Sequence, residues 1–367
     1  MIYFKDKDFC DFRYYLDTFI IPNLSHKPMK RPTFLLLSIF IPGFLFGQET
    51  AVTKLFMDEA PLEIRLSIDI KDVKAITNDT IYTPYVMQYK NGDKWDSIKI
   101  EVRARGDFRR RECYYPPLRV KIKKGVAKGT IFEGNKSLKL VMPCKQVKDN
   151  MLIMKEYACY QMYEPITKYT FNTRLVNMEF TDLNNKKITG VKFQGFFIED
   201  DDIVADRHKG KIVEDLKLHP KALQDSTSVR HDIFQYMVAN TDWSTTFLHN
   251  AKLIQLDESK KFIPLAYDFD MSGFVNAPYS QVNPELGISS VTDRLYRGFC
   301  REPAVIQAIR AEYVSKEQSI MDVVKRYEKD FDAKTYSTIV KFMQEFFTTM
   351  KNDNKFKAAI LDKCRTK

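Results

Sequence analysis

The hydrophobic period changes near the middle of the chain, and this change constrains the fold more than any other feature of the sequence. Apolar residues alternate with polar ones over 62–70, 98–104 and 118–122. A period of two is typical of half-buried strands. In the second half the period becomes three or four residues, over 228–239 and 302–362, which is typical of amphipathic helices. The sequence therefore predicts an α+β fold with a β-rich first part and a helical second part.

Further elements are predicted between these regions. A stripe of methionine and tyrosine residues at helical spacing predicts a helix over 149–164, which Pro165 ends. Apolar runs over 175–180 and 191–198 flank an asparagine-rich turn, and residues 251–267 form another hairpin pattern. The sequence therefore predicts a β-rich, N-lobe-like part over 48–224 and a mostly helical, C-lobe-like part over 225–367.

The N-terminal region contains a pattern typical of a secretory signal peptide over residues 29–47. Met29-Lys30-Arg31 is a short, positively charged N-terminal region, and an apolar core of fourteen residues follows over 33–46. Gly47 is a small residue at the expected cleavage site. The core is shorter than a membrane span requires. We expect translation to start at Met29 and residues 1–28 to be a non-native extension. A true extension with an internal anchor helix is the alternative. The protein is thus expected to be exported, to the periplasm, the outside or the cell surface.

Charge and cysteine content restrict the function classes. The net charge of +10 becomes +8 in the expected mature chain, because residues 1–28 are neutral overall and Lys30 and Arg31 are lost. This excess suits an anionic ligand such as a nucleotide. There is no aromatic and basic interleaving of the RNA-binding type, so nucleic acid is not an expected partner. The six cysteines form no CxxC pair, which disfavours structural zinc, and their spacing assigns no disulfide.

An acid, an amide and a second acid follow one another in the second half of the chain. Asp242 precedes Asn250 by eight positions and Asp268 by twenty-six. The apolar run 262–266 is typical of a buried strand, and Asp268 follows shortly after its end. Phosphoryl transfer from a nucleotide needs such a set, since one carboxylate orients the attacking hydroxyl while an amide and a second carboxylate hold Mg²⁺. Each residue alone is also typical of caps and turns, and Asp270 completes an Asp-x-Asp that does not continue as a calcium loop.

Six segments between residues 98 and 275 occur in an order that resembles one known family. The segments are Arg105-Gly106-Asp107, Pro116-Pro117-Leu118-Arg119-Val120-Lys121, Lys139-Leu140-Val141-Met142, Gly195-Phe196-Phe197-Ile198-Glu199, Asn240-x-Asp242 with His249-Asn250, and Tyr267-Asp268-Phe269-Asp270. In this order they resemble the CotH-like atypical protein kinases, named for spore-coat protein H. The resemblance implies a two-lobed kinase-like fold and the use of ATP with a divalent metal, Mg²⁺ or Mn²⁺. It also implies phosphorylation of a protein hydroxyl, as some members modify secreted or coat proteins.

The resemblance assigns roles to individual residues. Asp242 is expected to be the catalytic acid that orients the acceptor hydroxyl. Asn250 and Asp268 are expected to hold the metal, with Asp270 as a further candidate ligand. Arg105 and Lys121 are expected to contact the phosphates of the nucleotide. Glu199 is expected either to contact the nucleotide or to pair with a basic residue.

Two neighbouring features have simpler interpretations. We interpret His249 as a brace for its loop. We interpret the run Arg109-Arg110-Arg111 as a solvated turn, with contact to an acidic substrate as the alternative.

Other functions stay open at this point. An exported enzyme meets little ATP outside the cytoplasm. The protein would therefore act on its partner during export, use another phosphoryl donor, or have lost its activity. The main alternative is therefore a catalytically silent, kinase-shaped binding or scaffold protein at the cell surface. A metal-dependent hydrolase using Asp242, Asp268 and Asp270 is disfavoured because the five histidines are scattered. The expected partner is a protein substrate, such as an envelope or surface protein, and no stable membrane span is expected after signal cleavage.

Overall fold

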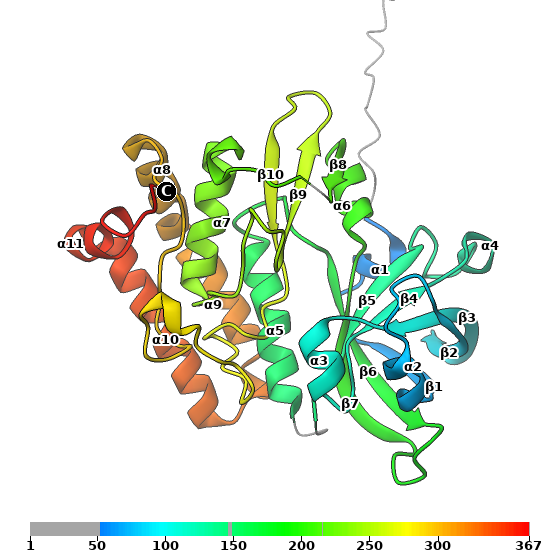
Figure 1. Ribbon diagram of the computed structural model, residues 1–367. Coiled ribbons are helices and arrows are strands. Elements are labelled where there is room, and N and C mark those ends of the chain that lie inside the picture. The colour runs from blue at the N-terminus through cyan, green and yellow to red at the C-terminus, as the bar shows by residue number, and fades with distance from the viewer. Residues whose placement is uncertain (1–51, 146–148, 215, 367) are drawn as a thin grey trace, which may run out of the picture. The chain divides into compact units, whose positions relative to one another are not determined.

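The first part of the fold is a closed barrel of strands (Figure 1). The computed structural model describes residues 52–145, 149–214 and 216–366, so the predicted signal peptide and the extension before it lie outside the described residues. Within the described residues the barrel has seven strands in the order β1-β2-β3-β4-β5-β7-β6. The strands are β1 (Leu62–Ile68), β2 (Thr83–Asn91), β3 (Lys94–Ala104), β4 (Leu118–Lys121), β5 (Ser137–Val141), β6 (Thr173–Asp182) and β7 (Val191–Ile198).

The barrel closes through a parallel pairing between β1 and β6, in which Leu62 lies opposite Val176. The other neighbouring strands pair antiparallel. Alternate side chains fill the interior, and Leu66, Val120 and Leu138 are fully buried there. Each such side chain contributes about 1.5–3 kcal/mol through removal from water. The alternation read from the sequence therefore corresponds to the inward face of the barrel.

Helices and a small sheet make up the second part of the fold, shown in green to red in Figure 1. The longer helices are α5 (Asn150–Tyr163), α7 (Asp225–Met237), α8 (Pro303–Ser315), α9 (Glu317–Arg326) and α10 (Ala333–Lys351). Of the shorter helices, α6 (Asp201–Arg207) and α11 (Asp353–Phe356) also belong to this part. The others, α1 (Lys54–Met57), α2 (Ile70–Ala75), α3 (Asp107–Glu112) and α4 (Lys124–Ala127), alternate along the chain with the barrel strands and are blue to cyan in Figure 1. The small sheet has the order β10-β9-β8 and contains β8 (Gly210–Val213), β9 (Ala251–Leu256) and β10 (Phe262–Ala266).

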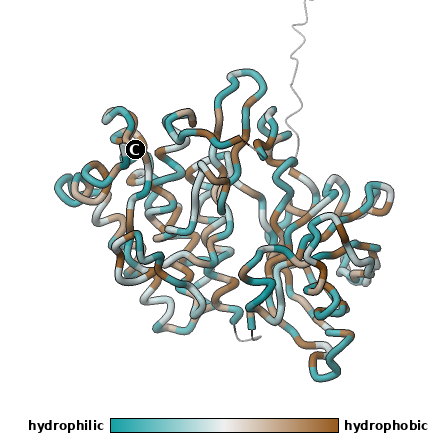
Figure 2. Tube along the Cα trace, viewed as in Figure 1, coloured by the Kyte–Doolittle hydropathy of each residue, from teal (hydrophilic) through white to brown (hydrophobic). Residues whose placement is uncertain are grey.

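The longer helices bury an apolar core of their own, separate from the barrel interior, whereas Leu55 of α1, Val73 of α2 and Ala127 of α4 belong to the barrel core. Helix α5 packs against α9 and β7, and α7 packs against α8 and β10. Figure 2 shows the turn between β9 and β10 as a hydrophilic tip, whereas apolar stretches follow the strands and helices. The helix predicted over 149–164 is confirmed as α5, and the hairpins predicted over 175–198 and 251–267 are confirmed as β6–β7 and β9–β10.

The predicted fold class, a two-lobed kinase-like fold, is wrong. The strands of the first part close into a barrel, and a separate sheet and many helices accompany it. The sequence pattern showed where strands lie but not which strands pair. The pairing of β1 with β6, between residues such as Arg65 and Glu179 that are 114 positions apart, turns a sheet into a barrel. In addition, α5 belongs to the expected β-rich part but packs in the helical core.

Two disulfides cross-link the described residues. Cys113, directly after α3, bonds to Cys144 after β5, and Cys300, before α8, bonds to Cys364 near the C-terminus. In the chain-entropy model such links stabilise by about 3–4 kcal/mol each through restriction of the unfolded chain. Cys159 in α5 is a buried free thiol. The scattered cysteines thus include pairs that their spacing did not reveal.

In the described part of the chain, every helix is too short or too polar to span a bilayer.

Candidate active site

A cavity of about 580 Å³ lies where the end of β3, α3, β4 and β5 meet the loops that follow α7 and β10. Five predicted site residues from distant parts of the sequence line it, namely Arg105, Asp242, Asn250, Asp268 and Asp270. The other lining residues include Arg109, Arg119, Lys139, Asp201, His249, Lys252 and Tyr267. The fold therefore gathers most of the predicted set into one polar chamber.

Asp242 is held in a tight loop after α7. The backbone N–H of Asp242 donates to Oδ1 of buried Asn240 at 3.0 Å, and the indole of Trp243 donates to the carbonyl of Asn240 at 3.1 Å. The Asp242 carboxylate accepts from His249 Nε2 at 2.9 Å and from Asn250 Nδ2 at 3.0 Å. Its two oxygens are thus oriented by neighbours, while each keeps a second lone pair for another donor.

His249 braces this loop, as the sequence analysis proposed. Its backbone N–H donates to Ser244 O at 3.0 Å, and its ring lies against Asp242. The hydrogen bond with Asp242 raises the pKa of His249, against a smaller opposing effect of burial.

Asn250 and Asp268 are arranged differently from Asp242. Both have left-handed backbone geometry, with φ of 46° and 64°, which Asn and Asp adopt more readily than other residues except glycine. Asn250 Nδ2 donates to the backbone carbonyl and the carboxylate of Asp242, and among the described residues its Oδ1 has no hydrogen-bond partner. The backbone N–H of Asp268 donates to the hydroxyl of Tyr160 at 2.9 Å. Among the described residues, the Asp268 carboxylate has no hydrogen bond or ion pair.

These open oxygens fit a hard divalent cation. Magnesium prefers carboxylate and amide oxygens, and it is usually held by one or two protein ligands together with water and phosphate. Across the described ranges, no group of three or more His, Cys, Asp and Glu side chains is placed to hold a metal by itself. A cation held by Asn250 and Asp268 would therefore complete its coordination with water or with a phosphate-bearing ligand.

Arg105 and Lys139 form the basic wall of the cavity. Within the described chain, the Arg105 guanidinium makes no hydrogen bond or ion pair. Burial lowers the pKa of Arg105, but attraction to Asp268 and its neighbours outweighs burial and raises it. Lys139, on β5, is only 3% exposed and forms an ion pair with Asp201. Burial lowers the pKa of Lys139 to about 8, with Asp201 opposing.

Lys139 is not among the predicted site residues, although the segment Lys139-Leu140-Val141-Met142 is part of the family resemblance. Leu138 and Leu140 face the barrel interior, so alternation places Lys139 on the outer side, where a lysine ordinarily meets water. All five residues of β5 are buried instead. The only signal in the sequence was the isolated cation within an apolar strand.

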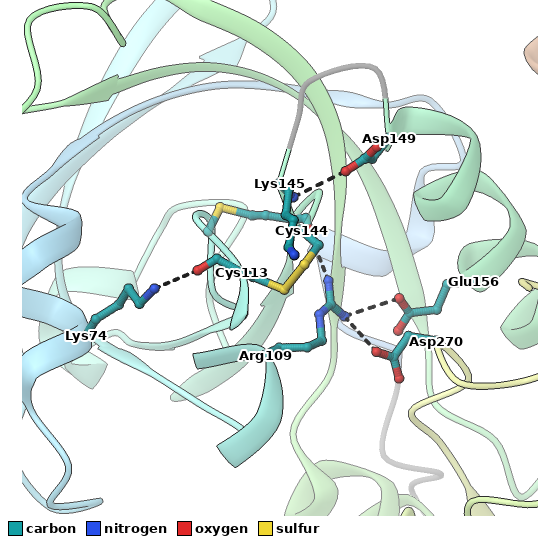
Figure 3. Close-up of a disulfide and its surroundings, with 9 residues drawn as sticks. Lys74, Arg109, Cys113, Cys144, Lys145, Asp149, Glu156 and Asp270 are labelled. Atoms are coloured by element: carbon teal, nitrogen blue, oxygen red, sulfur yellow. Dashed lines mark hydrogen bonds and ion pairs between the residues drawn. A yellow bond between two sulfur atoms is a disulfide. The ribbon is translucent and has the colours of Figure 1, made fainter. Parts of the chain in front are cut away.

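A buried cluster of Arg109, Asp270 and Glu156 lies beside the cavity (Figure 3). Arg109 is 7% exposed and donates to the backbone carbonyl of Met142 at 2.7 Å. Its Nη1 lies 3.5 Å from Glu156 Oε2 and 3.8 Å from Asp270 Oδ2. The interpretation of the arginine run as a solvated turn is therefore wrong for Arg109, because the helix α3 turns this side chain inward.

Burial sets the charge state of this cluster. It raises the pKa of Glu156 to about 8, against the attraction of Arg109. It also raises the pKa of Asp270 to about 6, an effect that Asp268 reinforces and Arg109 opposes. Because the Asp270 carboxylate contacts Arg109 and Tyr279, it is engaged by protein groups, whereas Asp268 is open.

The structure does not bring Lys121 or Glu199 to this cavity. The Lys121 ammonium lies 4.0 Å from the centroid of Tyr82, beside a separate groove of about 300 Å³. Glu199, 1% exposed, accepts hydrogen bonds from Arg207 at 2.7 Å and from the backbone of Asn172. Lys121 points outward from the barrel, and the Glu199 carboxylate is occupied by Arg207 and Asn172. Neither residue lines the cavity.

Comparison of the sequence with protein-family models finds no match. Comparison with curated proteins finds no match either.

Proposed function

We propose that the protein is an exported, metal-dependent kinase that transfers the γ-phosphoryl group of ATP to a protein hydroxyl. One observation carries this proposal: Asp242, Asn250, Asp268 and Arg105 line a single cavity. The motif resemblance to CotH-like kinases supports the same reaction. The proposal depends on the site and not on the fold, since sites of one chemistry occur on unrelated folds.

The arrangement separates the tasks of phosphoryl transfer. In this proposal the Asp242 carboxylate, which His249 and Asn250 orient, accepts a hydrogen bond from the acceptor hydroxyl. The hydroxyl oxygen attacks the γ-phosphorus, the bond from that phosphorus to the bridging oxygen breaks, and ADP leaves with the electron pair. Asp242 takes up the hydroxyl proton and later returns it to water.

The basic wall serves the phosphates. The open guanidinium of Arg105 can bind two phosphate oxygens. Lys139 on β5 adds the compact positive charge of its ammonium group to the same cavity. A divalent cation held by Asn250 Oδ1 and Asp268 supplies neutralisation of phosphate charge when it is bound.

Export is supported by two further features. The described residues contain two disulfides, which persist in oxidising compartments. The sequence pattern of residues 29–47 is that of a cleaved secretory leader.

Thermal unfolding of residues 48–367 tests the proposed site. We expect ATP with Mg²⁺ or Mn²⁺ to raise the melting temperature, because a ligand that binds only the folded state stabilises it. At a ligand concentration of about 100 times Kd the gain is about 2.7 kcal/mol. Asp268→Ala should abolish the shift.

The matched control is Asp257→Ala, which removes an exposed acid from the turn between β9 and β10 and should leave the shift intact. A shift that survives Asp268→Ala would contradict the assignment of the metal ligand. The absence of any shift with every nucleotide and metal tried would favour the catalytically silent surface protein.

A further inference from the structure

One short segment forms a whole side of the cavity. We call residues 105–111 the arginine arm, because it contains four arginines. It follows β3, includes most of α3 and contributes six of the residues that line the cavity, from Arg105 to Arg111. Helix α3 has only six residues, and isolated helices of that length are unstable in water. The arm therefore depends on its attachments for its position.

Two of these attachments meet at the end of β5. Cys113, directly after α3, is bonded to Cys144, and the backbone N–H of Cys113 donates to Arg109 O at 3.0 Å. Arg109 in turn donates to the carbonyl of Met142, two residues before Cys144. Figure 3 shows the disulfide and the Arg109 guanidinium lying side by side. The covalent link and the arginine thus fix the arm to the same strand end.

Arg109 also connects the arm to the helical part. Its guanidinium contacts Glu156 on α5 and Asp270 in the loop after β10. Asp270 is two residues beyond Asp268, the open carboxylate of the candidate site. Among the described side chains of the arm, Arg109 alone is buried and also contacts three other parts of the fold: Met142 after β5, Glu156 on α5 and Asp270 after β10.

Other contacts hold the arm at its two ends and at one ring near its centre. Arg105 N–H donates to Pro117 O at 2.8 Å at the base of the loop. The ammonium of Lys74 donates to the carbonyl of Cys113 at 2.7 Å, and near the centre the rings of Phe108 and Tyr279 lie 5.9 Å apart. The polar contacts from the centre of the arm to distant elements of the described fold are those of Arg109, and the disulfide holds its end.

We propose that Arg109 is a positioning residue that, together with the Cys113–Cys144 disulfide, locks the arginine arm against the candidate site, so that the site is fully formed only when this disulfide is oxidised. Reduction by a dithiol converts the disulfide to two thiols and the dithiol to its cyclic disulfide, and it releases the end of the arm. The consequence for ligand binding rests on the proposed function, whereas the locking of the arm does not.

The chain offers a matched control for this proposal. Cys300–Cys364 closes a longer loop than Cys113–Cys144, 64 residues against 31, so its removal should destabilise the whole protein at least as much. No residue of that second disulfide lines the cavity. The two double variants, Cys113→Ser with Cys144→Ser and Cys300→Ser with Cys364→Ser, therefore separate a local effect from a general one.

Amide hydrogen exchange of residues 105–113 tests the lock without any ligand. We expect exchange at least tenfold faster in the Cys113→Ser/Cys144→Ser protein than in the wild type, and unchanged exchange there in the Cys300→Ser/Cys364→Ser protein. Arg109→Gln, with both disulfides intact, should also accelerate exchange in this segment, and Arg109→Lys should restore protection in part. Equal exchange in the wild type and both Cys113→Ser/Cys144→Ser and Arg109→Gln would overturn the proposal.

Binding of Mn²⁺ and ATP, measured by calorimetry, tests the consequence. We expect Kd to rise at least tenfold in Cys113→Ser/Cys144→Ser and in Arg109→Gln, and to stay within twofold in Cys300→Ser/Cys364→Ser. A mobile arm with unchanged Kd would overturn the positioning role. A wild type that binds no nucleotide would overturn the proposed function instead, and the exchange result would still decide the lock.

Discussion

The buried pair of Lys139 and Asp201 gives a prediction that separates stability from function. Lys139 is 3% exposed and Asp201 is 8% exposed, and their side chains form an ion pair. The perturbation is a double-mutant cycle of Lys139→Met and Asp201→Asn. Met keeps the volume of the lysine stem, and Asn keeps the shape of the acid.

The magnitudes follow from the pKa values. Burial lowers the pKa of Lys139 from 10.5 to about 8, which opposes folding by about 3 kcal/mol at neutral pH. Although burial acts against it, attraction to Lys139 lowers the pKa of Asp201 from 3.8 to about 2, which favours folding by about 2 kcal/mol. The mutual attraction of the two side chains is counted in both values. Because the sum of the two effects is unfavourable even so, the ion pair gives no net stability to the folded state. Either single variant leaves a buried partner uncompensated and should lose about 2–4 kcal/mol, the Lys139→Met loss being moderated by Lys252.

The assay is urea unfolding at pH 7, followed by the ATP and Mn²⁺ melting shift. We expect the double variant to lie within about 1 kcal/mol of the wild type in unfolding free energy, far less than the sum of the two single losses. Its nucleotide-dependent shift should be absent. A double variant that loses the full sum of the single losses would refute the reasoning that the pair is coupled and without net benefit to stability.

Three further predictions concern other regions. Gly195→Ala on β7 should lower the unfolding free energy by about 1–3 kcal/mol in urea titrations, because its Cβ would lie 2.5 Å from the carbonyl of Val141 on β5; a loss below about 0.5 kcal/mol would show that the strands separate freely. Burial lowers the pKa of His208 to about 4, so the unfolded state binds a proton first and stability falls as pH drops from about 6.5 towards 4. His208→Gln should therefore make urea midpoints at pH 7 and pH 5 more alike, and an unchanged difference would contradict this. Lys121→Ala should leave the nucleotide-dependent melting shift intact, since Lys121 lies outside the cavity, and a lost shift would reverse that assignment.

Local patterns in the sequence located most strands and helices, because period and turn residues are properties of neighbouring positions. The hairpin of β9 and β10 and helix α5 are examples. Barrel closure was not predictable in the same way. The strands β1 and β6 carry no mark that identifies them as partners, and their pairing depends on how the intervening chain is arranged.

The candidate site likewise contains residues that local sequence patterns predict and residues whose role depends on distant elements. Asp242, Asn250 and Asp268 were found because they follow one another at strand and helix ends, and the fold places all three at the cavity. Lys139 and Arg109 were missed because their burial comes from distant elements, such as α6 for Lys139 and α5 for Arg109. Lys121 was selected from a basic strand, where alternation alone does not tell which side faces the cavity.

The seam between β1 and β6 has a consequence for how the chain reaches its folded state. Residue 65 on β1 is synthesised 114 positions before its neighbour on β6, residue 179. Until β6 is available, an incomplete barrel has unpaired strand edges, which are templates for wrong association with other chains. Contacts between such distant positions also form slowly. Productive folding therefore favours a chain whose first strand is kept extended and shielded until β6 (Thr173–Asp182) has been synthesised.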